Sequence, residues 1–415
     1  MPLSFNVLKS SDFRFLALSR MFTNMALQAQ AIIVGWQVYS ITHDPWMLGL
    51  TGLAEALPAL TCALFSGHVV DRNRPQLVLF SSQAVLVINT LMLFLVGGGI
   101  VTHQGFHILP FLYAGVFISG IARSFMMPSA FALMSKVVTK NQLPAASAWM
   151  NSGFQFGVIT APALAGLLYG GYGARVAWIL PLSFILISLT CNWQFSPAAK
   201  AARSDHQREP AWQSILGGWK FILHNRIMLS VMALDMFSVL FGGAVAMLPA
   251  YADQILHVGS QGLGILRAAP AIGSIIVAIA LAMQPMQKVK TRNLLLVICG
   301  FGLCMVCFGL SRSFTLSIFL LALSGAFDSV SVITRSTIFQ LLTPDDMRGR
   351  VAAVNSMFII SSNEIGAFES GLAARLLGLV PSVVIGGLAC LGVVGATALL
   401  SPKMRSLVID ADENR

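Results

Sequence analysis

Residues 52–59 read Gly-Leu-Ala-Glu-Ala-Leu-Pro-Ala, and residues 264–271 read Gly-Ile-Leu-Arg-Ala-Ala-Pro-Ala. The two stretches align without a gap, and Gly120 matches Gly325 at a similar offset, about half the length of the chain. Similarity at one fixed offset indicates two copies of one structural unit in the same orientation. We therefore expect a fold of two repeated halves.

Long apolar runs flank both copies, and each is long enough to cross a hydrocarbon core of about 30 Å. Hydrophobic residues make up 56% of the 415 residues and charged residues only 10%, too few charges for the surface of a soluble protein of this length. We expect spans near residues 13–41, 46–70, 76–98, 109–135, 144–169, 176–195, 227–251, 262–284, 293–311, 314–341, 350–375 and 380–400.

The expected fold class is an all-α membrane protein with twelve transmembrane helices in two six-helix bundles. Residues 1–195 form the N-terminal bundle, and residues 227–415 form the C-terminal bundle. Residues 196–226 are expected to be a cytoplasmic linker. It contains an amphipathic helix, because apolar residues recur there at three- and four-residue spacing.

The placement of the basic residues predicts the orientation of the spans. The formal net charge is +10, and most Lys and Arg residues lie in the terminal tails and even-numbered loops, as do Arg72, Lys136 and Arg350. Cytoplasmic loops carry such an excess. We expect a multi-pass protein of the bacterial inner (cytoplasmic) membrane with both termini in the cytoplasm, and no nucleic-acid partner.

The loop between the second and third spans reads Gly67-His-Val-Val-Asp71-Arg72-Asn-Arg74. It resembles the G-x-x-x-D-R-x-x-R loop of the major facilitator superfamily. Further stretches, at residues 248–253, 262–269, 343–351 and 363–367, resemble the branch that contains the bacterial enterobactin exporter.

That resemblance extends over essentially the whole chain. It implies the twelve-helix fold, proton-driven export and a siderophore as cargo, although drug and macrolide efflux proteins belong to the same branch. The superfamily's usual arginine in the fourth span precedes its glycine, whereas Arg123 follows Gly120. The role of that arginine is therefore not carried over.

Polar residues inside the spans are the candidates for transport chemistry, because a charge at mid-bilayer costs about 2.5–3.5 kcal/mol. A guanidinium keeps its proton and needs water, substrate or a carboxylate beside it. Several such groups suggest an anionic or polyoxygenated amphiphile as the cargo. The residues expected to line the substrate cavity are Arg20, Asn24, Gln28, Arg123, Arg267 and Arg335.

The residues expected to couple transport to protons are Glu55, Asp235, Asp328 and Glu364. Desolvation favours the protonated form of a carboxyl group, and a nearby arginine reverses that preference. Asp328 and Arg335 lie on one polar stripe, which either pairs helices structurally or lines the transport path. Glu369 is expected closer to the far interface.

The motif residues Gly67, Asp71, Arg72 and Arg74 are expected at the cytoplasmic surface, where they latch the two bundles in one state. We expect no cofactor and no metal site, since the sequence lacks a phosphate-binding G-x-x-x-x-G-K-[ST] and Cys304-x-x-Cys307 has no second pair or nearby His.

The sequence favours proton-coupled transport by alternating access and argues against an enzyme, because no nucleophile and base lie together at membrane depth. The expected partners are a small-molecule substrate, protons and the lipid bilayer, and a monomer is the default. An importer of the same fold, a drug efflux pump and a non-transporting receptor remain alternatives.

Overall fold

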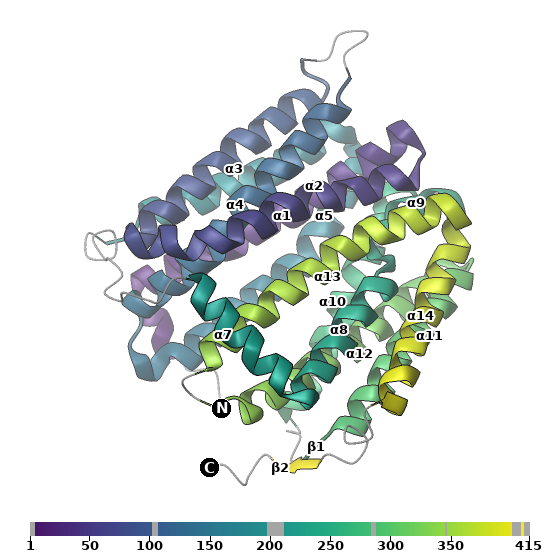
Figure 1. The fold of residues 1–415 in the computed structure, drawn as a ribbon. Helices are drawn as coiled ribbons and strands as arrows, with labels where there is room; N and C mark the ends of the chain where they lie inside the picture. Colours follow the sequence, from purple (N-terminus) through teal and green to yellow (C-terminus); the bar gives the residue numbers. More distant parts are fainter. Residues whose placement is uncertain are drawn as a thin grey trace. The chain divides into compact units, whose positions relative to one another are not determined.

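The computed structural model of the chain describes residues 5–101, 107–196, 211–283, 288–344, 347–400 and 408–410, and nearly all of these are helical (Figure 1). The first half contains η1 (Phe5–Lys9), α1 (Ser11–Thr42), α2 (Pro45–Arg72), α3 (Pro75–Gly97), α4 (Leu109–Val137), η2 (Lys140–Gln142) and α5 (Leu143–Trp193). The second half contains α7 (Ala211–His224), α8 (Arg226–Gly242), η3 (Ala244–Met247), α9 (Leu248–Ala250), the π-helix η4 (Tyr251–Ile255), α10 (Gly259–Met283), α11 (Thr291–Leu310), α12 (Phe314–Leu342), α13 (Arg348–Leu377) and α14 (Leu379–Leu400).

Local sequence explains where several helices begin. Proline stands at the first or second position of α3, α4 and α5, where its fixed φ suits a helix and its missing N–H is not needed. The Asn225 side chain accepts hydrogen bonds from the first backbone N–H groups of α8, and Ser313 does the same for α12. These caps satisfy N–H groups that have no partner inside the helix.

Within the described residues, nine helices are long and apolar enough to cross a membrane. One is α5, whose 51 residues cover two of the expected spans and bend at Gly173, where φ is 81° and a side chain would be strained. Helices α1 and α13 are 32 and 30 residues long but more polar, and they fall outside that set. The structure therefore confirms a helical chain whose helices are long and apolar enough to span a membrane, whereas the count of twelve stays a prediction.

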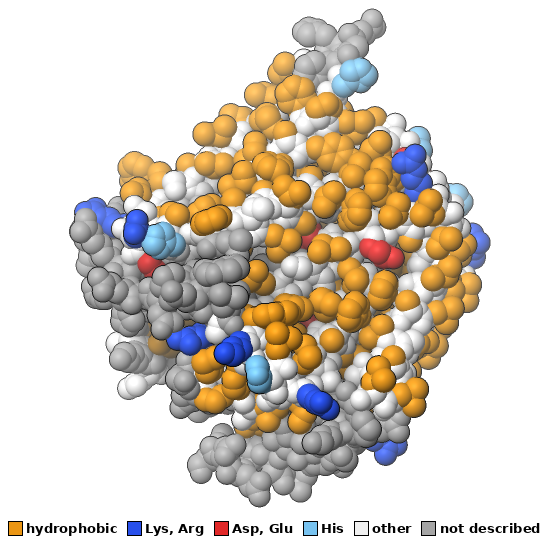
Figure 2. All heavy atoms as spheres, viewed as in Figure 1, with side chains coloured by type: hydrophobic (Ala, Val, Ile, Leu, Met, Phe, Trp, Pro, Cys, Tyr) orange, Lys and Arg blue, Asp and Glu red, His pale blue; other side chains and the backbone are white. Residues whose placement is uncertain are grey.

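Large apolar side chains lie exposed along these helices, Phe65, Ile88 and Phe319 among them. Figure 2 shows one face on which hydrophobic side chains are spread over much of the described surface, whereas Lys and Arg side chains are few. Exposed apolar area on this scale marks a surface made for a partner or a membrane. Together with the long apolar helices, this exposed apolar area fits a surface that faces lipid.

Contacts between Cα atoms divide the chain into two units. Unit 1 comprises Met1–Thr42, Ala54–Ala211 and Gly259–Gly264, and unit 2 comprises His43–Leu53, Trp212–Val258 and Ile265–Arg415. The first turns of α2 thus belong to unit 2, and the first turns of α10 belong to unit 1. The predicted bundle boundaries at residues 195 and 227 stay predictions.

In unit 1, a buried polar cluster joins α1, α3 and α5. The Gln83 amide donates hydrogen bonds to the hydroxyls of Ser19 and Ser188, both at 2.7 Å, and its oxygen accepts one from Asn192 at 3.0 Å. Such bonds hold helices together where lipid offers no hydrophobic drive, at about 0.6 kcal/mol each.

In unit 2, small residues bring α10 and α12 into backbone contact. A Cβ atom added at Gly325 would overlap the carbonyl group of Pro270, and one added at Gly273 would overlap the carbonyl of Ala322. The Ser274 hydroxyl donates a 2.8 Å hydrogen bond to the Gly325 carbonyl across the same contact. Only glycine allows helices to pack this closely.

Helix α7 lies in the segment where an amphipathic helix was expected, and the preceding linker residues 197–210 lie outside the described residues. Its apolar face packs against α13, because Ile222 is fully buried and the rings of Trp219 and Phe358 stack at 5.3 Å. Contact of α7 with the inner leaflet stays a prediction.

The structure adds one feature to the expected all-α fold. Strands β1 (Lys288–Lys290) and β2 (Val408–Asp410) pair antiparallel, with Val289 opposite Ile409. The central positions of both strands carry β-branched residues, which favour extended backbone.

Replacing Gly325 with alanine should destabilise unit 2 by about 1–3 kcal/mol, because the added methyl group forces two backbones apart. The control is Gly392→Ala in α14, where an added Cβ meets nothing within 4 Å. Thermal unfolding of the purified protein in detergent measures both. Equal Tm values for the two variants would contradict the close contact.

Candidate functional site

In unit 1, Arg123 of α4 forms an ion pair with Glu55 of α2. The Arg123 side chain is 46% exposed and the Glu55 side chain 22% exposed. Gly120 explains how the pair forms. A Cβ atom at this position would lie 2.6 Å from the Glu55 carbonyl oxygen and 2.9 Å from the Pro58 ring, so only glycine lets α4 approach α2 here.

In unit 2, Arg335 of α12 forms an ion pair with Asp235 of α8. This pair is more deeply buried, with side chains 8% and 15% exposed. Asp328 lies on the same helix as Arg335, two turns away or about 10 Å along the axis. Asp328 is half-buried, and it makes no hydrogen bond or ion pair with any residue that the structure describes.

A third charged contact in unit 2 involves Arg267 of α10, which is half-buried. Its guanidinium donates a 3.2 Å hydrogen bond to the carbonyl of Val245 in η3 and interacts electrostatically with Glu364 of α13. The η3 segment interrupts the helical stretch that begins with α8. Its backbone carbonyls are consequently open to a side chain from another helix.

On α1, Arg20, Asn24 and Gln28 recur at four-residue spacing, and only Asn24 of the three forms a hydrogen bond with another described helix. The Asn24 amide donates a 3.0 Å hydrogen bond to the Phe154 carbonyl of α5. Arg20 and Gln28, one turn to either side, are half-buried and make no hydrogen bond or ion pair with the described residues. Arg20 therefore retains its capacity to bind an anion.

The residues of the expected latch lie at the turn between α2 and α3. Gly67 has open space on its Cβ side, and Arg72 ends α2. Arg72 and Arg74 are exposed, whereas Asp71 is half-buried and makes an interaction of its own. Their role as a latch stays a prediction.

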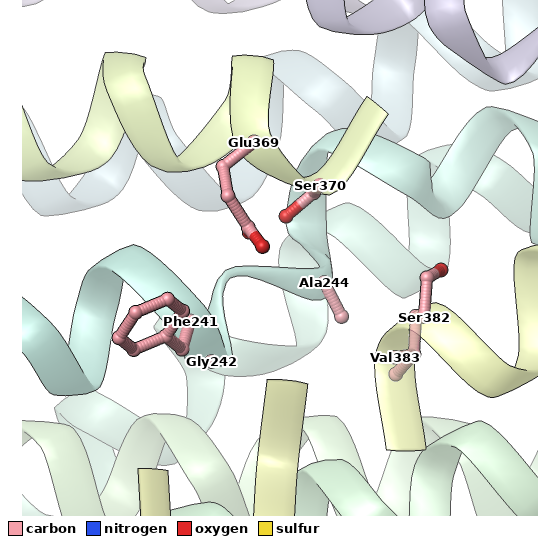
Figure 3. A pocket seen from close by; sticks show the side chains of 7 residues that line it. All are labelled: Phe241, Gly242, Ala244, Glu369, Ser370, Ser382 and Val383. Atoms are coloured by element: carbon pink, nitrogen blue, oxygen red, sulfur yellow. The ribbon is translucent and has the colours of Figure 1, made fainter. Parts of the chain in front are cut away.

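Glu369 of α13 is a carboxylate outside the predicted coupling set. It lines a small pocket of unit 2 together with Ser370, Ser382 and residues at the end of α8 (Figure 3). The signal that could have revealed this site was the Gly242-Gly243 pair, which interrupts an apolar span. No group of three or more His, Cys, Asp or Glu residues that could hold a metal ion occurs among the described residues.

Removing one partner of the buried pair should cost more than removing one partner of the exposed pair. We expect Arg335→Ala to destabilise the protein by about 3–5 kcal/mol, because it leaves the Asp235 charge unpaired. The loss for Arg123→Ala should be about 1 kcal/mol or less.

Thermal unfolding in detergent measures both losses. The Asp235→Ala/Arg335→Ala double variant serves as the control, and it should recover part of the stability because no buried charge remains. An Arg123→Ala loss as large as that of Arg335→Ala would mean that the Glu55 pair is chiefly structural.

Comparison with known proteins shows which family the chain resembles. The model of the Major Facilitator Superfamily matches residues 16–367. The enterobactin exporter EntS of Shigella boydii serotype 4 (strain Sb227) is 24% identical over 399 residues, covering 96% of this chain and 94% of that protein. EntS of Escherichia coli O81 (strain ED1a) shows the same identity and coverage.

Solved structures resemble the chain in fold alone. A POT family transporter in complex with a thioalcohol-conjugated peptide has a TM-score of 0.75 at 10% identity, covering 94% of this chain and 96% of that one. A variant of the nucleoside transporter NupG has a TM-score of 0.66 at 14% identity, covering 94% and 100%.

Proposed function

Because the chain belongs to the major facilitator superfamily and is a membrane transporter, not an enzyme, we propose that it is a proton-coupled exporter. Its cargo is a siderophore or another amphiphilic anionic small molecule. Cargo binds at arginines within the membrane-spanning helices, and alternating access carries it across the bacterial inner membrane. Both termini lie in the cytoplasm, and the protein acts as a monomer.

The ion pair of Arg123 with Glu55 is the observation that carries this proposal. The two residues come from different helices, and nearly half of the Arg123 side chain is exposed. An anionic group of the cargo can therefore reach the guanidinium and compete with the Glu55 carboxylate for it. Arginine suits this exchange because it stays charged and binds carboxylate or phenolate oxygens through two N–H groups.

The same exchange supplies the coupling to protons. While Glu55 is paired with Arg123, the carboxylate form is favoured. When the cargo takes over the guanidinium, Glu55 loses its counter-charge while its own side chain is only 22% exposed, and the carboxyl group takes up a proton. Release of the cargo restores the ion pair and expels that proton. Cargo and proton thus bind together and are released together, so they cross the membrane in the same direction. Export by this cycle is driven by the outward concentration gradient of the cargo, and an inward proton gradient opposes it.

Arg20 and Arg267 support the anionic character of the cargo. Arg20 is half-buried without a charged partner among the described residues, and Arg267 reaches a backbone carbonyl as well as Glu364. A cargo with several acidic oxygens can bind more than one such cation. The relatives that match almost the full chain are exporters of enterobactin by name, which favours a siderophore and outward transport.

The loop of Asp71, Arg72 and Arg74 is proposed to act apart from the cargo. Its exposed arginines at the end of α2 and before α3 can bind acidic groups or helix ends of the other bundle. Such contacts would hold one state of the transport cycle without contacting the cargo.

The cargo and direction are tested by deleting the gene in iron-starved cells and comparing these with complemented cells. Mass spectrometry of cells and medium should find one compound that accumulates inside the deletion strain and disappears from its medium. A compound depleted inside and left outside would instead establish an importer. No difference in either fraction would leave a drug efflux pump or a receptor as the function.

The roles of the charged residues are tested in everted membrane vesicles with the compound so identified. Arg123→Ala and Arg267→Ala should each lower the uptake rate about tenfold or more, because each removes a charged contact of about 1.4 kcal/mol or more to the anion. Arg14→Ala, an exposed position in the first turn of α1, is the control and should keep the wild-type rate.

Glu55→Gln should make transport independent of the pH gradient. The variant should still carry cargo down a concentration gradient, and collapsing the pH gradient should no longer change the rate. Unchanged transport in Arg123→Ala and Arg267→Ala would overturn the anion site. A Glu55→Gln variant that still responds to the pH gradient would overturn the coupling role of Glu55.

A further inference from the structure

The pocket beside Glu369 lies where the seventh predicted span is interrupted (Figure 3). Helix α8 ends at Gly242, and Gly243 has φ −78° and ψ 58°, which does not continue the helix. The chain resumes as η3 at Ala244. The last carbonyl groups of α8 therefore lack the partners that a continuous helix would provide, and they form the negative end of its dipole.

Two glycines hold these carbonyls inside unit 2. A Cβ atom at Gly366 of α13 would lie 3.0 Å from the Leu240 oxygen, and one at Gly386 of α14 would overlap the Phe241 oxygen. Both neighbouring helices thus approach the last turn of α8 closely. The end of α8 is shielded by backbone rather than by side chains that could donate hydrogen bonds.

The side chain of Glu369 points from α13 toward this interruption (Figure 3). It makes no hydrogen bond or ion pair with any residue that the structure describes. The two hydroxyls of the pocket already donate elsewhere, Ser370 to the Gly243 carbonyl at 3.3 Å and Ser382 to the Leu379 carbonyl at 2.8 Å. The oxygens that face the pocket are consequently acceptors.

None of the residues that line the pocket carries a positive charge. Neither η3 nor α14 contains a charged residue. On α8, Asp235 is paired with Arg335. On α13, Glu364 interacts with Arg267, and Arg375 lies over the Trp46 ring at 5.9 Å from its centroid. A negatively charged carboxylate surrounded by hydrogen-bond acceptors and apolar groups costs free energy unless a cation binds beside it.

The size of the pocket narrows the choice of cation. It has room for about one water-sized species, which excludes an organic cargo. Its ligands are carboxylate, hydroxyl and carbonyl oxygens, which suit hard cations. We infer that the pocket formed by Glu369, Ser370 and the end of α8 binds a small monovalent cation, a proton or a sodium ion.

This site adds a second ion-binding carboxylate to the one in unit 1. Its part in coupling rests on the proposed function, whereas binding of the ion itself does not require cargo or transport. A bound cation would neutralise Glu369 and link the end of α8 to α13. Occupation of the pocket would thereby stabilise the packing of three helices in unit 2.

The test uses the purified full-length protein in detergent without cargo, and it follows Tm while sodium replaces potassium at fixed pH and while the pH is lowered without sodium. The binding ion should raise Tm by about 3 °C or more at saturation, because it binds only the folded state. In Glu369→Gln that rise should disappear. Asp253→Asn, which alters a carboxylate outside the pocket, should keep it.

The two titrations separate the two ions. A Tm rise with sodium that depends on Glu369 identifies a sodium site, and a Glu369-dependent rise only on acidification identifies a proton site. Equal responses of wild type and Glu369→Gln to both titrations would overturn the site.

Ser370→Ala keeps the carboxylate and should weaken ion binding severalfold, so it tests the pocket even if Glu369→Gln does not fold. Unchanged apparent affinity in Ser370→Ala would count against the pocket. Glu369-dependent ion binding in a protein whose deletion leaves every exported compound unchanged would refute the proposed function while confirming the site.

Discussion

A charge placed between membrane-spanning helices is costly unless a counter-charge lies beside it, because the interior of a membrane protein offers little water. The ion pairs of Arg123 with Glu55 and of Arg335 with Asp235 satisfy this constraint in different ways. The second pair is closed off and holds α8 against α12. The first is open enough for another anion to displace its carboxylate. The proposed transport cycle depends on that difference.

The two copies of the internal repeat both bring helix backbones into close contact, but they carry different charged residues. Gly120 and Gly325 occupy equivalent positions in the repeat. Gly120 brings α4 against the backbone of α2, and Gly325 brings α12 against the backbone of α10. Gly120 meets the Glu55 carbonyl, whereas Gly325 meets the carbonyl of Pro270, the counterpart of Pro58. The two helix pairs therefore differ in register by about one turn.

This shift accounts for the different pairing in the two units. Arg123 and Asp328 each follow their repeat glycine by one turn, and Glu55 and Arg267 are the matching positions on the other helix. In unit 1 the two positions form an ion pair. In unit 2 the register places Arg267 nearer to the interrupted span, where it bonds the Val245 carbonyl.

Much of the fold could be predicted from the sequence, because the apolar runs and the internal repeat can both be recognised without knowing how the helices pack. The charged candidates could be found for the same reason. Their partners could not, since the pairing of Arg335 with Asp235 depends on how α8 and α12 are rotated about their axes. The bend at Gly173, the β1–β2 pair and the orientation of Glu369 also follow from tertiary packing.

The central claim is that an anion displaces Glu55 from Arg123 and that Glu55 then takes up a proton. The most direct measurement adds the compound identified in the deletion strain to the purified protein in lightly buffered detergent and follows proton uptake with a pH indicator. The account predicts uptake in the wild type and its loss in Glu55→Gln, which has no carboxylate to protonate. Binding without proton uptake, or equal uptake in Glu55→Gln, would contradict it.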